Sequence, residues 1–323
     1  MHRPELSVVV ASHDRPLRLR WLLNALAEQT LAAERWEVVV CHDSRGAETD
    51  ALLAGHPLAE AGVLRWRAFE PGRAAASPKR NAGVAMARAP TVVFTDDDCR
   101  PPTGWLSAVA DAVAAHPGAV IQGPMAPDPD EATMLRAPFP RTVAFDDVPR
   151  VWAESCNIAY PTELLRELGP FAEDLHVGED TDLALRARQA GAPFVGDRRM
   201  LSYHAVEEGM PWDRVAQARR WEDMALLLAR QPSLRRALYL RVFWKREHAL
   251  LLAAVAGMAL GGRGRRSLAP LAALPWALAR PDHGGGVRGR ARQLAALPVW
   301  ALSDLAETAV LARASVRRRT LIL

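Results

Sequence analysis

The first hundred residues alternate between short β-branched runs and longer segments with helical spacing, and this alternation constrains the fold more than any other feature. Four runs are predicted strands, at residues 6–12 (LSVVVAS), 36–42 (WEVVVCH), 63–69 (VLRWRAF) and 91–96 (TVVFTD). Helical patterns lie between them, at residues 16–29, 47–61 and 77–89. Nearly continuous apolar strands separated by helices are typical of βαβ units, in which helices cover both faces of a parallel sheet. The sequence therefore predicts an α/β fold with a mostly parallel sheet.

Three consecutive aspartates, Asp96, Asp97 and Asp98, follow the last of these strands. Ligands of parallel α/β sheets bind beyond the carboxyl ends of the strands, so the triplet lies where a site is expected. Successive side chains of an extended segment alternate in direction, which lets Asp96 and Asp98 point the same way. Mg²⁺ and Mn²⁺ prefer carboxylate oxygens, and a D-x-D pair could hold one of them against a diphosphate. A solvated acidic turn, or capping of the next helix by Asp98, explains the triplet alone equally well.

A second acidic cluster, Glu179, Asp180 and Asp182, opens a segment with helical spacing at residues 178–191. The free N–H groups and the dipole of a helix N-terminus stabilise negative charge, so capping accounts for one or two of these residues. A carboxylate in an apolar-walled cleft can instead act as a general base toward a hydroxyl group.

Two motifs of other nucleotide enzymes are missing from the sequence. No GxGxxG follows the first strand, which argues against an NAD enzyme, and no GxxxxGK[ST] occurs, which argues against a P-loop NTPase.

Six segments occur in the order SVVVASHDRP, EVVVCHDS, ASPKRNAG, VVFTDDDCRPPTGWL, NIAYPTELLRELGPF and GEDTDLALRARQAG. Together they resemble the family-2 glycosyltransferases, over about residues 5–206. The resemblance implies a GT-A fold and an inverting transfer of a hexosyl group from a nucleotide-diphosphate sugar to a hydroxyl acceptor. A non-catalytic nucleotide-sugar-binding protein of this fold is one alternative. A sugar nucleotidyltransferase is another, but it would normally show a Gly-rich phosphate loop after the first strand.

The resemblance also implies roles for individual residues at the donor side. Asp14 and Asp43 would contact the base and ribose of the nucleotide. Two departures from the family pattern, HDR for Y-N/D-R and CHDS for DDGS, fall beside these residues. The implied donor-binding set is Asp14, Asp43, Lys79, Arg80, Asn81 and Asp97.

The remaining implied roles concern the metal, the base and the acceptor. Mg²⁺ or Mn²⁺ would be held by Asp96, Asp98 and His204, although a core histidine explains His204 equally well. Asp180 would be the base that deprotonates the acceptor, ionised at rest and near the metal but not bound to it. The possible acceptor-side residues are Glu179, Asp182, Trp212 and Trp221.

Charge divides the chain into two parts, for which we predict a catalytic domain at residues 1–207 and a helical, basic region at 208–323. From residue 230 onward there are 17 Arg and Lys against 4 Asp and Glu, a surplus of +13, so the net charge of +4 leaves −9 for the residues before it. Three widely spaced cysteines (Cys41, Cys99 and Cys156) favour a reducing compartment over a disulfide framework or a zinc site. The N-terminus enters a strand pattern without room for a signal peptide, so we expect a cytoplasmic catalytic domain.

The basic region contains three apolar segments, at residues 248–262, 268–279 and 294–312, each too short or too interrupted for a clean transmembrane helix. Arginines flank them: Arg263, Arg265, Arg266, Arg288, Arg290, Arg292 and Arg317 to Arg319. This pattern suits interfacial helices on the anionic inner face of the cell membrane, and hence a lipid-linked or cell-envelope glycan as acceptor. An ordinary helical subdomain is the alternative, and nucleic acid is a weaker one because the basic residues flank apolar blocks.

Overall fold

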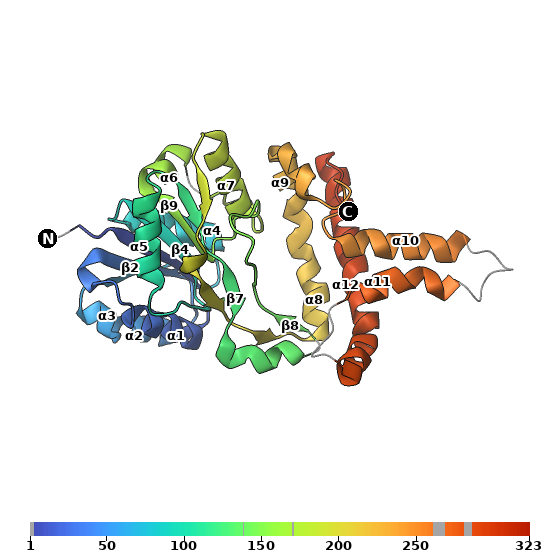
Figure 1. Ribbon diagram of the computed structural model, residues 1–323, viewed down its shortest axis with the longest axis horizontal. Coiled ribbons are helices and arrows are strands. Elements are labelled where there is room, and N and C mark those ends of the chain that lie inside the picture. The colour runs from blue at the N-terminus through green and yellow to red at the C-terminus, as the bar shows by residue number, and fades with distance from the viewer. Residues whose placement is uncertain (1–2, 138, 170, 261–268, 281–285) are drawn as a thin grey trace. The chain divides into compact units, whose positions relative to one another are not determined.

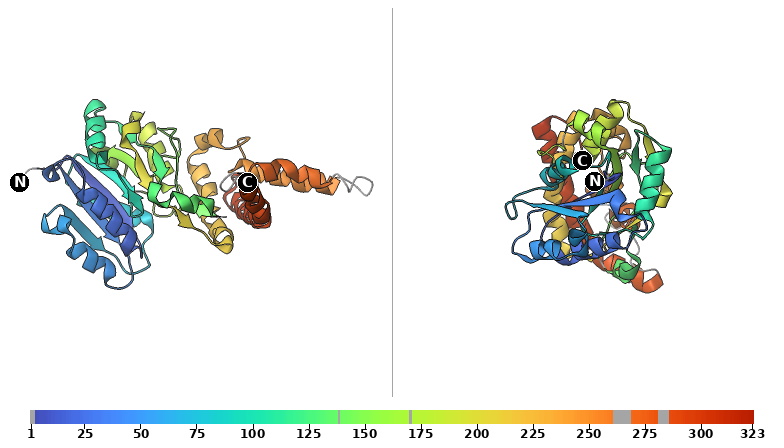
Figure 2. Two further views of the ribbon diagram at one scale, coloured as in Figure 1. Left: turned by 60° about the horizontal axis from the view of Figure 1, so that its bottom comes forward. Right: turned by 90° about the vertical axis from the view of Figure 1, so that its left-hand side faces the viewer.

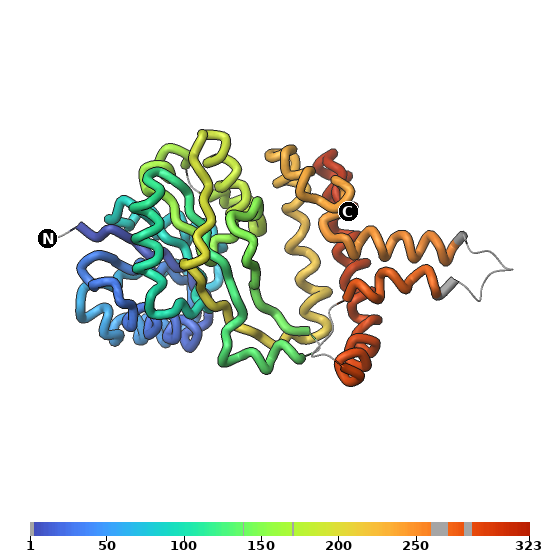
Figure 3. The backbone as a smooth tube through the Cα atoms, in the orientation of Figure 1, coloured from blue at the N-terminus to red at the C-terminus, as the bar shows by residue number. Residues whose placement is uncertain are grey.

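The computed structural model describes residues 3–137, 139–169, 171–260, 269–280 and 286–323 (Figure 1). The chain forms two compact units, the first comprising Met1–Pro129 and Thr142–Ala205 and the second Asp130–Arg141 and Val206–Leu323. The predicted division after residue 207 lies close to the end of the first unit, but residues 130–141 group with the second. The reason is a short antiparallel pair of β8 (Pro140–Arg141) with β12 (Glu207–Glu208), which can be followed along the chain in Figure 3.

The first unit is built on a seven-stranded sheet in the order β10-β6-β9-β4-β1-β2-β3. All of its strands are parallel except β9, which runs antiparallel to its neighbours β4 and β6. The predicted α/β fold with a mostly parallel sheet is therefore confirmed. The strands are β1 (Leu6–Ser12), β2 (Trp36–His42), β3 (Leu64–Ala68), β4 (Thr91–Asp96), β6 (Val120–Gln122), β9 (Asn157–Pro161) and β10 (Phe194–Gly196).

Helices cover both faces of this sheet. Val8 and Val10 of β1 pack with α1 (Pro16–Ala27), α2 (Glu48–Ala54), α3 (Pro57–Glu60) and α5 (Trp105–Ala115). Val9 points to the opposite face and packs with α4 (Ala76–Met86), α6 (Thr162–Leu168) and α7 (Glu179–Gln189). The predicted helix at 47–61 is two helices, because His56 precedes a proline and is extended, and its side chain accepts from the Leu58 N–H.

Helix α4 lies unusually close to the sheet at Gly83. A Cβ added there would lie 2.3 Å from a methyl carbon of Val9, so only glycine allows this approach. The close packing places the first turns of α4, which carry Lys79 and Arg80, beside the carboxyl ends of the central strands.

A second, three-stranded sheet lies in the order β5-β11-β7, with β5 (Cys99–Arg100), β11 (Ser202–His204) and β7 (Met125–Pro127). Strand β11 pairs antiparallel with β5, which sets His204 opposite Cys99. Because Cys99 directly follows Asp98, this pairing brings a histidine from far along the chain to the aspartate triplet.

In the described residues the second unit is mostly helical, with the β8–β12 pair and a single antiparallel bridge between Tyr239 and Phe243. Its elements after β12 are α8 (Pro211–Gln217), η4 (Ala218–Glu222), α9 (Asp223–Arg230), η5 (Pro232–Ala237), α10 (Arg246–Leu260), η6 (Ala269–Ala273), α11 (Leu274–Leu278) and α12 (Gly286–Arg318). Helix α12 contacts α8, α9 and α10, and Trp276 and Trp300 lie in the core of this unit. The predicted flanking arginines Arg263, Arg265 and Arg266 lie outside the described residues.

Among the described residues, one helix, α12, is long and apolar enough to cross a membrane. Length and composition alone are weak evidence, since the core helix of a water-soluble domain can meet the same criterion. Two carboxylates of α12 are buried and paired within the unit: Asp304 accepts from Arg280 and Trp276, and Glu307 from Lys245 and His248. These pairs favour α12 as the core helix of the second unit.

Candidate active site

Two arginines flank the aspartate triplet at the carboxyl end of β4. Arg80 Nη2 lies 3.0 Å from Asp96 Oδ1, and Arg15 Nη1 lies 2.6 Å from Asp98 Oδ2 and 3.6 Å from Asp97 Oδ1. The repulsion among three adjacent carboxylates is thus offset by a guanidinium on each side. The sequence analysis did not identify Arg15. Its position in the loop after β1, directly before Pro16 begins α1, is the signal that could have identified it.

Asp97 is buried and contacts both Arg15 and the end of β1. Its Oδ2 accepts from the Ser12 hydroxyl at 2.7 Å and from the His13 N–H at 3.3 Å. Burial raises the pKa of Asp97 to about 7, and the neighbouring Asp98 adds to the shift. These contacts favour a role in holding the end of β1, and donor binding by Asp97 stays a prediction.

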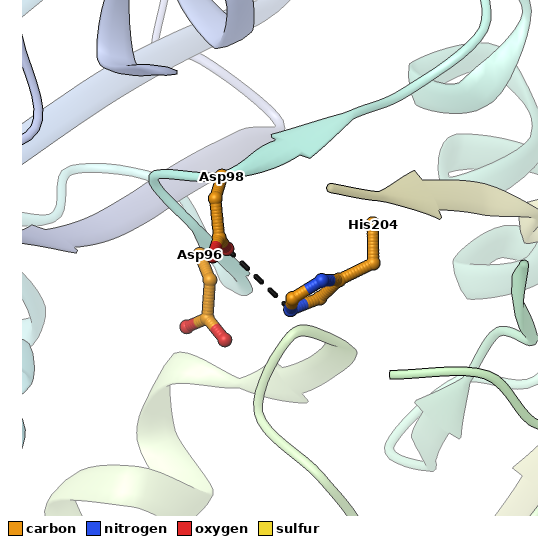
Figure 4. Close-up of side chains that lie close together, drawn as sticks. All are labelled: Asp96, Asp98 and His204. Carbon is orange, nitrogen blue, oxygen red and sulfur yellow. Dashed lines mark ion pairs between the residues drawn. The ribbon is translucent and has the colours of Figure 1, made fainter. Parts of the chain in front are cut away.

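Asp96, Asp98 and His204 converge from three different segments, β4, the turn before β5, and β11 (Figure 4). Each offers a ligand atom within 4.8 Å of the other two. His204 Nδ1 lies 3.0 Å from the Ala205 carbonyl, and an N–H donated there leaves the Nε2 lone pair free, 3.5 Å from Asp98 Oδ1. Imidazoles that bind metals are oriented in this way. Two carboxylates and an imidazole fit Mn²⁺, and the carboxylates alone fit Mg²⁺.

Arg80 connects this cluster to the N-terminus of α7. Its Nη1 donates to Glu179 Oε1 at 2.8 Å while Nη2 holds Asp96, and both Arg80 and Glu179 are buried. Gly178 begins α7 with a φ of 85°, a left-handed conformation that suits glycine. The Glu179 carboxylate is engaged by Arg80, and its contact with an acceptor stays a prediction.

Asp180 lies one residue further along α7. Its Oδ1 accepts from the Thr181 N–H at 2.7 Å, and its Oδ2 from the Ser155 N–H at 3.3 Å. Burial raises the pKa of Asp180 to about 8, and the like charge of Glu179 adds to the shift. This shift favours the protonated carboxyl, and the expectation that Asp180 is ionised at rest stays a prediction.

The other predicted acceptor-side residues have different surroundings. Asp182 is buried and accepts from Arg186 Nε at 2.9 Å within α7, which indicates a structural role. Trp212 and Trp221 belong to the second unit, where Trp212 is exposed and Trp221 packs against Trp244 with ring centroids 5.1 Å apart. Their contact with an acceptor stays a prediction.

Lys79, one of the predicted donor-binding residues, lies at the ends of β1 and β2. Its Nζ lies 2.5 Å from Asp43 Oδ1 and 3.0 Å from the Ser12 carbonyl, and both charged side chains are buried. Burial acts to raise the pKa of Asp43, but the hydrogen bond and charge of Lys79 lower it overall. The lysine therefore neutralises Asp43.

The two remaining donor-side residues connect loops in the structure. Asp14, with a φ of 49°, accepts from the Arg45 N–H at 2.6 Å and ties the loop after β1 to the loop after β2. Asn81 was expected at the donor site, but its amide donates to the Phe171 carbonyl at 3.1 Å and accepts from the Phe171 N–H at 2.7 Å. Asn81 thus holds the segment after α6, and nucleotide contacts by Asp14 and Asp43 stay predictions.

Comparison with known proteins places these features in a family. The model of "Glycosyl transferase family 2" matches residues 7–169, about half of the chain. Validoxylamine A glucosyltransferase of Streptomyces hygroscopicus subsp. jinggangensis is 27% identical over 247 residues, which cover 64% of this chain and 57% of that protein. This chain therefore spans little more than half the length of that relative.

Solved structures share the fold at lower sequence identity. The mannosyltransferase PcManGT of Pyrobaculum calidifontis, in complex with GDP-Man and Mn²⁺, aligns with a TM-score of 0.58 and 19% identity, covering 97% of this chain and 88% of that one. Residues 1–349 of S. aureus TarS, in complex with UDP-GlcNAc, align with a TM-score of 0.54 and 18% identity, covering 98% and 92%. The order of the strands and the likeness to these solved structures show that the chain has a GT-A-like fold. Since the family model matches half of the sequence, this chain belongs to glycosyl transferase family 2.

Proposed function

We propose that this protein is an inverting, divalent-metal-dependent glycosyltransferase that moves a sugar from a nucleotide-diphosphate sugar to a hydroxyl acceptor. The observation that carries the proposal is the convergence of Asp96, Asp98 and His204 at the carboxyl end of β4, with the His204 ring oriented by the Ala205 carbonyl. The nucleotide sugars bound by PcManGT and TarS, and the activity of the validoxylamine A glucosyltransferase, support the same class of donor.

Each part of the site has a place in this reaction. Asp96, Asp98 and His204 would hold Mg²⁺ or Mn²⁺, which stabilises negative charge developing on the diphosphate as the glycosidic bond breaks. Arg80 fixes the position of Asp96 and ties it to Glu179, beside the base. Lys79 and Asp43 hold the ends of β1 and β2 against which the nucleotide would lie.

Asp180 is the proposed base. It accepts the proton of the acceptor hydroxyl while that oxygen attacks the anomeric carbon from the face opposite the diphosphate, so a single displacement inverts the configuration. Since burial favours the protonated carboxyl, Asp180 must first lose a proton, and the positive charge of Arg80 favours that loss.

The proposed acceptor is a lipid-linked or cell-envelope glycan at the cytoplasmic face of the cell membrane. The basic balance of residues 230–323 and the exposed apolar side chains of the second unit support a membrane location.

A thermal-shift screen of nucleotide sugars, with and without Mn²⁺, tests the donor site. A ligand at about 100 times its Kd stabilises the folded state by about 2.7 kcal/mol, a shift of roughly 5–10 °C. We expect a Mn²⁺-dependent shift with one donor that is lost in Asp98→Asn and kept in Asp111→Asn, a control on exposed α5 surface. A shift that Asp98→Asn retains would refute the metal assignment.

Turnover then separates an enzyme from a non-catalytic binder of the same fold. With the donor identified, we expect its slow hydrolysis or its transfer to simple hydroxyl acceptors, and the loss of this activity in Asp180→Asn with donor binding intact. Donor binding without any turnover in the wild type would favour the non-catalytic alternative.

A further inference from the structure

A segment with neither helix nor strand, residues 146–156, precedes β9 and is coloured green in Figure 2. It reaches the N-terminus of α7, where the Ser155 N–H donates to Asp180 Oδ2 at 3.3 Å. One residue further along α7, Thr181 Oγ1 donates to the Trp152 carbonyl at 2.8 Å. The segment therefore contacts the proposed base directly, and its position decides where one oxygen of the Asp180 carboxyl can lie.

The same segment is attached to the sheet by Gln122, the last residue of β6. Gln122 is fully buried, and both ends of its amide bind the segment. Its Oε1 accepts from the Arg150 N–H at 2.7 Å, and its Nε2 donates to Glu154 Oε2 at 3.2 Å. Arg150 Nη1 lies 2.8 Å from Glu154 Oε1, so the two residues that Gln122 binds also bind each other. We call residues 150–155 the 150–155 turn.

The backbone of the 150–155 turn needs this support. Ala153 is buried and has a φ of 49°, in the left-handed region that is unfavourable for a residue with a Cβ. Such a conformation persists only where the surrounding contacts hold it. The chain also approaches the sheet closely just before the turn, since a Cβ added at Gly196 of β10 would lie 2.3 Å from the Val148 carbonyl oxygen. The turn is thus held between the sheet and α7.

We propose that Gln122 is a positioning residue, which fixes the Ser155 N–H through the 150–155 turn and thereby orients the Asp180 carboxyl. The proposal rests on the assignment of Asp180 as the base in the proposed function. Each oxygen of this carboxyl accepts one backbone N–H, Oδ1 from Thr181 and Oδ2 from Ser155. Two such bonds fix the plane of the carboxyl and leave lone pairs that can accept the proton of the acceptor hydroxyl.

Loss of the Gln122 amide should slow the chemical step and leave donor binding intact. A displacement of about 1 Å at a reacting group can lower a rate about 100-fold, even when the substitution is remote from the chemistry. The residues that would hold the metal, Asp96, Asp98 and His204, belong to other segments of the chain. A purely structural role of Gln122 would lower stability without this separation of kcat from donor KM.

Two variants break the contact from its two sides, and a third is a matched control. Gln122→Met keeps the length of the buried side chain but has no amide, and Glu154→Ala removes the partner, whose side chain is 25% exposed. The control is Gln29→Met, because Gln29 also connects two segments of the first unit. Its Nε2 donates to the Pro102 carbonyl at 2.8 Å, and its Oε1 accepts from the Leu106 N–H at 2.8 Å.

Three quantities are measured on the full chain with each variant: hydrogen exchange of the peptide that contains Ser155, the donor-induced thermal shift, and kcat with the donor KM. We expect Gln122→Met and Glu154→Ala to exchange faster in that peptide and to lose on the order of 10- to 100-fold in kcat, with donor shift and donor KM kept. Gln29→Met should show neither change. In an Asp180→Asn background Gln122→Met should slow the residual reaction no further, since no base is left to position.

Unchanged exchange in both variants would overturn the proposal, as would a loss of kcat that Gln29→Met shares or that persists in the Asp180→Asn background. If Gln122→Met does not fold, Glu154→Ala decides the same question from the partly exposed side of the contact. Absence of turnover in the wild type, or turnover that Asp180→Asn keeps, would instead contradict the proposed function. The exchange rates would then still show whether Gln122 holds the turn.

Discussion

The raised pKa of Asp180 makes the pH dependence of catalysis the sharpest test of its role. Activity that needs an ionised Asp180 should rise with pH, and kcat/KM should show an acidic limb with its midpoint near 8. Two neighbours act on this midpoint in opposite directions, because Glu179 raises the pKa of Asp180 and Arg80 lowers it. Glu179→Gln should therefore move the limb to lower pH, and Arg80→Gln should move it to higher pH.

The magnitude follows from the ionised fraction. With a pKa of about 8, about one-tenth of Asp180 is ionised at pH 7. Removing a neighbouring charge changes a pKa by about one unit or more, so Glu179→Gln should bring the ionised fraction at pH 7 to about one half, and Arg80→Gln to about one-hundredth.

The assay measures kcat/KM of the holoenzyme between pH 5.5 and 9.5 for the wild type, both variants and Glu163→Gln. Glu163 is an exposed carboxylate of α6 paired with Arg166, so its removal controls for the general loss of one negative charge. The quantity compared is the pH midpoint of the kcat/KM profile. The size of kcat/KM is not compared, because Arg80→Gln also removes the contact with Asp96 and would lower the rate for that reason. Midpoints that stay fixed, or that move the same way in both variants, would mean that the acidic limb belongs to another group.

Three further predictions concern stability. The pKa of Asp180 is higher in the folded than in the unfolded state, so its contribution to the free energy of unfolding is complete below about pH 4 and is lost as the pH rises to about 8. In urea unfolding, the wild type should therefore lose up to about 4 kcal/mol relative to Asp180→Asn between pH 5 and 8. Lys79→Met removes the buried lysine that pairs with Asp43 and leaves the carboxylate beside the partly exposed imidazole of His13, which should cost about 3–5 kcal/mol in the same assay. Asp43→Asn with Lys79→Met should recover part of this loss. Gly83→Ala forces a Cβ against Val9 and should cost about 1–3 kcal/mol, and combining it with Val9→Ala should recover stability if the clash is the cause.

The sequence predicts where the site lies in the fold, because the location depends on only a few physical rules. Apolar strands alternating with helices dictate the parallel sheet, and a parallel sheet collects the strand ends, and hence Asp43 and the aspartate triplet, at one edge. Asp97 contacts Ser12 and His13. Because Asp97 and Asp98 lie in a turn after β4 and share Arg15, the period-2 alternation of an extended chain does not account for their positions by itself.

The pairing of charges does not follow from the sequence, because it depends on the rotation of a helix against the sheet. Lys79 and Arg80 are adjacent in the chain, but consecutive residues of a helix point about 100° apart. Lys79 therefore reaches Asp43 at the end of β2, while Arg80 reaches Asp96 at the end of β4. The grouping of residues 130–141 with the second unit is similarly hidden, since two-residue strands such as β8 and β12 carry no alternation pattern.

The charge balance of the triplet bears on how a donor would bind. Arg80 is shared between Asp96 and Glu179, and Arg15 between Asp97 and Asp98, so two guanidiniums face four carboxyl groups. A diphosphate arriving alone would add negative charge to a site that already has more carboxyl groups than guanidiniums, and it would compete with the carboxylates for Arg15 and Arg80. A divalent cation that arrives with the diphosphate compensates that charge. Donor and cation should therefore stabilise the protein together far more than the sum of their separate effects, and equal additive shifts would contradict this account of the site.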